Sequence, residues 1–217
     1  MQQLGPYRRP PVSDAKRDGD ERPDYGAKDP PKRHVHEGLF ARFAGGFGGG
    51  RDAIEGTGEG GFSGTASGLA LATEVALGFT PLRGFVLGGA IDTLTLPSPE
   101  ASDGPDFALT QLEQFGLFAA YYPDPRGGLH VQGGLGLAAL VMGQGFARGG
   151  VAGTSAYTAI GIGGMLGAGH EWWIADEWGM GLLGRLLYAS ASASDSSGIE
   201  WSHSTLGWAI LLSATYH

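Results

Sequence analysis

Beyond residue 36, charged residues are sparse. Most stand singly in segments where large apolar side chains alternate with small or polar ones. Five of them occupy the face that also carries glycine, alanine and small polar residues: Arg42, Glu74, Asp92, Glu171 and Arg185. Buried ionic groups are tolerated when they pair with opposite charges. We therefore predict an enclosed charge network in which Arg42 and Glu74 pair on neighbouring strands. Such a network could gate a polar path, but we prefer the interpretation that it fills a desolvated interior.

A histidine followed by a serine suggests hydrolysis by an activated hydroxyl, which needs the two side chains within hydrogen-bond reach. His203 and Ser204 are adjacent, and adjacent side chains on a strand point to opposite faces. His203 therefore shares its face with Thr205. A lipid-modifying enzyme remains a minor alternative, and we predict no catalytic residue.

His34 and His36 share a face of an extended segment and could hold a divalent ion only with further ligands. The neighbouring sequence supplies no such set. We expect a solvated tail here, with neither a metal site nor a cofactor.

The chain is organised around residues 156–190, where apolar and small side chains alternate. This alternation predicts two long strands, 156–173 and 178–190, joined by a tight turn at 174–177. In the second strand the even positions include Met180, Leu182 and Leu186, while Arg185 occupies the odd face. Large apolar side chains on one face and small or charged ones on the other are typical of a lipid-exposed barrel hairpin.

Six further strands are predicted from the same alternation. They cover residues 38–47, 65–78, 84–94, 107–121, 129–141 and 203–216. Short connections at 79–83, 122–128 and 174–177 alternate with long polar ones, as in barrels of the outer membrane. We therefore predict an all-β fold, an eight-stranded antiparallel up-and-down transmembrane β-barrel over residues 37–217.

Aromatic residues gather beside the short connections and at the C-terminus, where a belt at the membrane interface is expected. The residues assigned to this belt are Phe79, Tyr121, Tyr122, Trp172, Trp178 and Tyr216.

Two other architectures compete with the barrel. Residues 127–147 and 149–170 are long enough for membrane helices and contain no Asp, Glu, Lys or Arg, but their many glycines disfavour a helix. A soluble barrel would have the same alternation with its faces reversed, since periodicity alone does not distinguish inside from outside. Small side chains beside the charges suit a narrow lumen, which favours the membrane barrel.

The composition excludes some classes of function. The chain has 217 residues, 41 glycines, no cysteine and a net charge of −8. An acidic balance argues against nucleic acid as a partner, because phosphate binding needs clustered cations. The absence of cysteine excludes disulfides and cysteine metal sites within this sequence.

Residues 1–36 are rich in proline and charge and contain few aliphatic residues, so we predict a disordered periplasmic tail. No apolar leader precedes them, although an exported protein requires a signal peptide. We expect that the sequence as given omits it.

Residues 37–217 resemble the small eight-stranded outer-membrane barrels of the outer membrane protein A and outer membrane protein W type. The strand pattern, the Gly-His-Glu-Trp-Trp run that leads into Asp-Glu-Trp at 169–178, and the closing strand 207–217 carry the resemblance. The closing strand is similar to the C-terminal signal read by the barrel assembly machinery, although that signal usually ends in an aromatic residue and His217 is last here.

The resemblance implies a monomer in the outer membrane of a Gram-negative cell envelope, in contact with outer-membrane lipid and lipopolysaccharide. It names an architecture and no activity. We expect a structural or surface-interaction role with a lumen largely filled by side chains. The alternative is a porin-like narrow pore for small or apolar solutes.

Overall fold

The computed structural model describes residues 34–217 except 59–60, 62, 103–106, 145–155 and 195–198. The predicted tail, apart from His34, Val35 and His36, lies outside the described residues. The elements are β1 Gly38–Thr57, β2 Ser63–Leu82, β3 Phe85–Pro97, β4 Glu100–Ala101, β5 Phe107–Tyr121, β6 Leu129–Gln144, β7 Ala156–Trp173, β8 Trp178–Ser194 and β9 Glu200–Tyr216. In the described part of the chain, no helix is long and apolar enough to cross a membrane.

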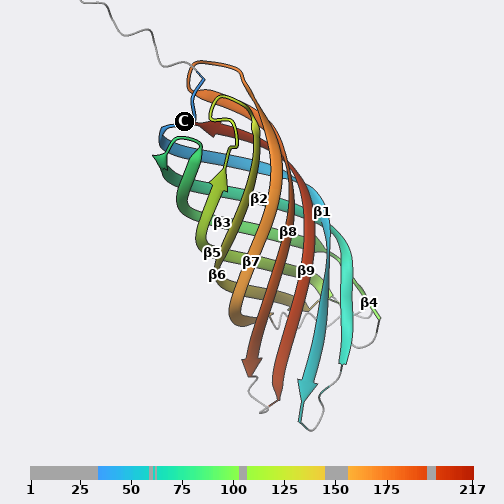
Figure 1. Cartoon of the computed structure of the whole chain (residues 1–217). Coiled ribbons are helices and arrows are strands. Elements are labelled where there is room, and N and C mark those ends of the chain that lie inside the picture. Colours follow the sequence, from blue (N-terminus) through green and yellow to red (C-terminus); the bar gives the residue numbers. More distant parts are fainter. Residues whose placement is uncertain (1–33, 59–60, 62, 103–106, 145–155, 195–198) are drawn as a thin grey trace, which may run out of the picture. The chain divides into compact units, whose positions relative to one another are not determined.

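The eight long strands form one antiparallel sheet in which each strand pairs with its neighbour along the chain. The first and last strands also pair, from Ala41 opposite Tyr216 to Thr57 opposite Glu200, and this pairing closes the barrel. The two-residue strand β4 adds to β2 alone. The predicted eight-stranded up-and-down barrel is therefore confirmed, and its tilted strands are visible in Figure 1.

Three short connections and the C-terminus lie at one end of the barrel, which we call the short-turn end (Figure 1). The tightest connection joins β2 to β3 through Arg83 and Gly84. Gly84 adopts a φ of 74°, a left-handed conformation that favours glycine. The turn predicted at 174–177 is confirmed, because β7 ends at Trp173 and β8 begins at Trp178.

Large apolar side chains are exposed on the outer face of every long strand, whereas the charged residues predicted to face inward are buried. On β2, for example, Leu69 is 80% exposed and Leu71 62%, while Glu74 is 1% exposed. An apolar surface this extensive would be unstable in water and is suited to lipid. The structure thus places the apolar face outside, opposite to the arrangement in a soluble barrel.

The strand boundaries differ from the prediction most in β1, which continues ten residues past the predicted end at Phe47 to Thr57. Gly48, Gly49 and Gly50 interrupt the apolar alternation there, so the sequence pattern stops before the strand does. At Gly48 an added Cβ would lie 1.8 Å from the Trp208 carbonyl oxygen, which shows how closely β1 and β9 approach.

Candidate functional site

Four charged residues and a glutamine form a hydrogen-bonded group inside the barrel, which we call the charge layer: Arg42, Glu74, Asp92, Gln132 and Arg185. Glu74 accepts from Arg42 Nε at 2.5 Å and from Arg185 Nη1 at 2.6 Å. Arg185 also pairs with Asp92, and Arg42 donates to Gln132. All five are buried. Two guanidinium groups and two carboxylates balance each other, so the layer carries no net charge at neutral pH when all four are ionised.

Two buried apolar clusters border the charge layer. One includes Phe40 and Phe118 and is nearer the short-turn end; the other includes Ile54 and Leu140. On β2 and β3 the inward residue on the short-turn side of the charge, Ala76 or Ala90, belongs to the first cluster, and the residue on the far side, Ala72 or Leu94, belongs to the second. On β8 the order is reversed, because Leu183 lies nearer the short-turn end than Arg185 but belongs to the second cluster, and Leu187 belongs to the first. The described lumen is therefore filled above, within and below the charges.

Glu171 does not make the contacts predicted for it. Its Oε1 accepts hydrogen bonds from Tyr122 at 3.2 Å and Thr215 at 3.0 Å, and its Oε2 lies 3.1 Å from His217 Nε2. Glu171 is two residues from the end of β7 and thus belongs to the short-turn end. With His36, these residues form what we call the rim cluster.

The predicted aromatic belt is wrong at Tyr122. This residue is 0% exposed and stacks on His36 with ring centroids 3.7 Å apart, so it lies inside the barrel and not at the membrane interface. Burial, with the adjacent charge of Glu171, raises the pKa of its hydroxyl, which remains a donor at neutral pH. The other belt residues lie on the outer side, and of these Phe79, Tyr121, Trp172 and Trp178 are between 43% and 57% exposed.

His36 is likewise not part of a solvated tail. It is 1% exposed, its Nε2 lies 2.8 Å from the Gly127 carbonyl oxygen, and its backbone N–H bonds to the carbonyl of Pro125. Burial, followed by the nearby His217, lowers the pKa of His36 to about 4, so the ring is neutral at pH 7. The ordered chain thus begins before residue 37. His34 is exposed, as predicted for both histidines.

A further polar group escaped prediction because β1 was expected to end at Phe47. Asp52 accepts from Thr205 Oγ1 at 2.7 Å and lies 2.8 Å from His203 Nδ1, and all three are buried. Ser204 faces outward, with its hydroxyl 3.4 Å from that of Tyr188. His203 and Ser204 are therefore on opposite faces, and they do not form a nucleophile–base pair.

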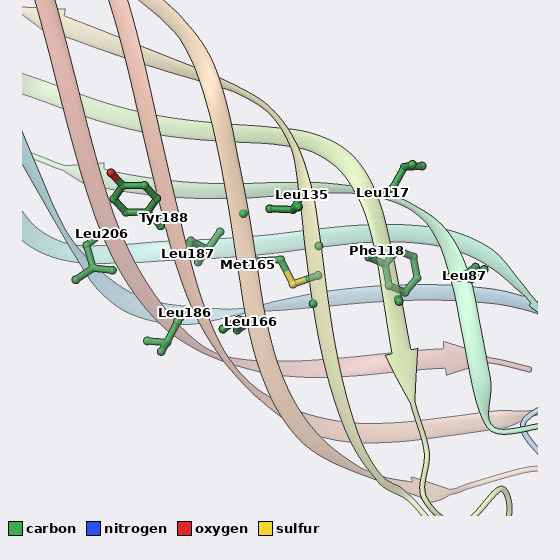
Figure 2. Close-up of a pocket in the computed structure, with 14 residues that line it drawn as sticks. Leu87, Leu117, Phe118, Leu135, Met165, Leu166, Leu186, Leu187, Tyr188 and Leu206 are labelled. Carbon is green, nitrogen blue, oxygen red and sulfur yellow. The ribbon is translucent and has the colours of Figure 1, made fainter.

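The outer wall carries an apolar groove of about 930 Å³ across strands β3 to β9. Gly133 and Gly164 occupy outward positions there and contribute no side chain, so the wall is hollowed between their neighbours Leu135 and Leu166. Figure 2 shows the leucines that border the groove, together with Phe118, Met165 and Leu187. These last three are buried, so interior side chains form the floor of the groove.

Solved outer-membrane barrels are similar to this chain. The outer membrane protein OprG from Pseudomonas aeruginosa aligns with a TM-score of 0.53 at 14% identity over 85% of this chain and 99% of its own. Neisserial surface protein A aligns with a TM-score of 0.49 at 12% identity, over 83% of this chain and 99% of its own. The fold is that of a small outer-membrane β-barrel. The attachment invasion locus protein Ail of Yersinia pestis aligns with a TM-score of 0.38 at 11% identity, over 81% of this chain and 99% of its own. No protein-family model and no curated protein sequence matches the chain.

Proposed function

We propose that this chain is a plugged, non-conducting barrel of the outer membrane that acts structurally or through its surface. The charge layer, flanked on both sides by buried apolar side chains, is the observation that carries this proposal. Ions crossing the lumen would have to displace paired charges and then pass tightly packed apolar side chains on each side. Both steps are costly, since unpaired buried charges and disrupted cores each cost several kcal/mol.

The outer face supports a membrane location. Exposed leucine, isoleucine and phenylalanine side chains fit the hydrocarbon of outer-membrane lipid, including lipopolysaccharide. The short turns and the termini would then lie in the periplasm, as they do in bacterial barrels generally. Strand β9 ends at Tyr216 and is followed by His217, and it would serve as the signal for the barrel assembly machinery. The single closed sheet is compatible with a monomer.

A non-enzymatic role is supported by the hydroxyl and imidazole groups of the lumen. His203 bonds to Asp52 but shares no face with Ser204, and Thr205 already donates its hydroxyl to the same aspartate. Asp52, His203 and Thr205 are buried, which argues against access by a lipid or peptide substrate.

Liposome swelling tests the proposed function. Proteoliposomes of the refolded barrel are placed in isotonic solutions of small sugars and amino acids, with a general porin in matched vesicles as control. We expect swelling no faster than in empty liposomes. Uptake above that level would establish the pore and overturn the proposal.

The groove favours a second candidate function, the binding of one lipid acyl chain against the outer wall. The groove faces the lipid and lacks side chains at Gly133 and Gly164, so a chain could lie closer to the barrel there. Gly133→Leu should fill the groove and reduce lipid retention in native mass spectrometry. Gly45→Leu is the control, because Gly45 is an exposed glycine on β1 with open space around it. Equal retention by both variants would contradict this candidate.

A further inference from the structure

The rim cluster brings together three metal-ligating side chains that are far apart in the sequence. His36 precedes β1, Glu171 lies near the end of β7, and His217 follows β9. One ligand atom from each lies within 4.8 Å of the others, and all three residues are buried. His36 Nδ1 lies 3.0 Å from His217 Nε2, which lies 3.1 Å from Glu171 Oε2.

The hydrogen bonds around the cluster set which atoms are available. His36 Nε2 donates to the Gly127 carbonyl, so in the neutral ring Nδ1 carries a lone pair that points at His217. Glu171 Oε2 is also an acceptor directed at His217. A neutral His217 ring has one N–H and so satisfies only one of these two acceptors. A metal ion between these atoms would satisfy both acceptors.

The surroundings resemble those of bound metals, whose ligands are held by outer hydrogen bonds. The Gly127 carbonyl orients His36, while Tyr122 and Thr215 bond to Glu171 Oε1 and leave Oε2 directed inward. His130 also contacts the Tyr122 ring, and its buried Nε2 has no hydrogen-bond partner among the described residues. The low pKa of His36 keeps its ring neutral, which is the form that binds metals.

The spacing fits a small ion. Two ligand atoms each ~2.1 Å from a tetrahedral zinc ion lie ~3.4 Å apart, within about 0.4 Å of the 3.0 and 3.1 Å separations here. Two imidazoles and one carboxylate suit zinc and related transition metals, whereas calcium and magnesium prefer oxygen ligands.

We propose that His36, Glu171 and His217 bind one divalent transition-metal ion, zinc being the best chemical match, at the short-turn end of the barrel. The ion would join the segment before β1 to the residue after β9 and to β7. It would thereby fasten the seam where the first and last strands meet. The fourth coordination position of a tetrahedral ion is left for water or for His130.

Zinc titration of the untagged, refolded full chain by calorimetry tests the proposal, after treatment with chelator. We expect one equivalent of Zn²⁺ in wild type, and binding at least about 100-fold weaker in His36→Ala, His217→Ala and Glu171→Gln. Tyr122→Phe should weaken binding by about 10-fold through the loss of an outer hydrogen bond. His170→Ala is the matched control, since His170 is exposed and adjacent to Glu171.

Failure of wild type to bind Zn²⁺ would overturn the proposal. Binding that persists in all three ligand variants, or is lost in His170→Ala alone, would equally overturn it by placing the metal on the surface. Glu171→Gln keeps the side-chain volume and guards against loss of folding in the histidine variants. As a second measurement, Zn²⁺ should raise the unfolding temperature of wild type and of His170→Ala, but not of Glu171→Gln; equal shifts in all three would contradict the site.

Discussion

Among the residues of the charge layer, Glu74 has the central position because it accepts from two guanidinium groups. Arg42 bonds to one of its oxygens and Arg185 to the other, whereas the carboxylate partner of Arg42 is Glu74, at 2.5 Å. Removal of one member of a buried ion pair costs more than the pair contributes, since a charge is left without compensation. Substitution of Glu74 and substitution of Arg42 should therefore lower the free energy of unfolding by different amounts.

We predict that Glu74→Gln lowers the free energy of unfolding by about 3–5 kcal/mol, because it deprives both arginines of a carboxylate. Arg42→Met should cost less, since Glu74 keeps its bond to Arg185. The double variant should recover part of the sum, with a coupling of at least about 1 kcal/mol. Urea unfolding in lipid vesicles measures all three. Equal single effects with coupling below about 0.5 kcal/mol would contradict the assigned bonds.

At the scale of strands, the alternation of side chains made the barrel and its two faces predictable, because lipid and lumen impose opposite demands on successive residues. It also made the inward positions of Glu74, Asp92 and Arg185 predictable. The end of β1 was missed because Gly48–Gly50 carry no side chains from which a face can be recognised, and Asp52 was missed with it. Tyr121 and Tyr122 are adjacent and must face opposite sides, a signal that could have placed Tyr122 inside.

The rim cluster was harder to predict from the sequence. His36 and His217 are separated by 181 residues, and their contact depends on the pairing of β1 with β9. Closure of an even-stranded barrel does predict that the first and last strands are neighbours. It does not predict that the chain before β1 folds back so that His36 Nε2 meets the Gly127 carbonyl, which depends on the turn after β5.

The segment before β1 yields a prediction by truncation. Removal of residues 1–33 should leave the unfolding temperature of the barrel unchanged, because the sequence there has no apolar period to pack. Removal of residues 1–36 should lower the stability by about 1–3 kcal/mol, through loss of the buried hydrogen bonds of His36. Thermal unfolding in detergent compares the two. A large effect of the shorter truncation would show that the tail supports the barrel.

The seam between β1 and β9 gives a matched pair of glycine substitutions. In Gly48→Ala the new Cβ would meet the Trp208 carbonyl oxygen at 1.8 Å, so the strands must separate. In Gly45→Ala the Cβ meets nothing within 4 Å. We expect a marked loss of folded barrel for Gly48→Ala and a yield equal to wild type or higher for Gly45→Ala, measured by the fraction that resists SDS before boiling. Equal yields would show that β1 and β9 do not approach this closely.

At the scale of the whole molecule, the chain encloses polar residues in a closed sheet and presents apolar residues outward. The charge layer and the two apolar clusters leave the described lumen filled along its length. A barrel of eight strands has room for side chains but little more. This packing is the basis for our proposal of a role at the surface and not of transport through the centre.

Recording of single channels in planar lipid bilayers tests the plugged lumen most directly. The refolded chain is added at increasing amounts, with a general porin as positive control and the same detergent alone as negative control. Insertion is verified by the shift between unboiled and boiled protein on a denaturing gel. The account predicts a current indistinguishable from the bilayer with detergent alone. Discrete, reproducible conductance steps in proportion to the protein inserted would contradict it.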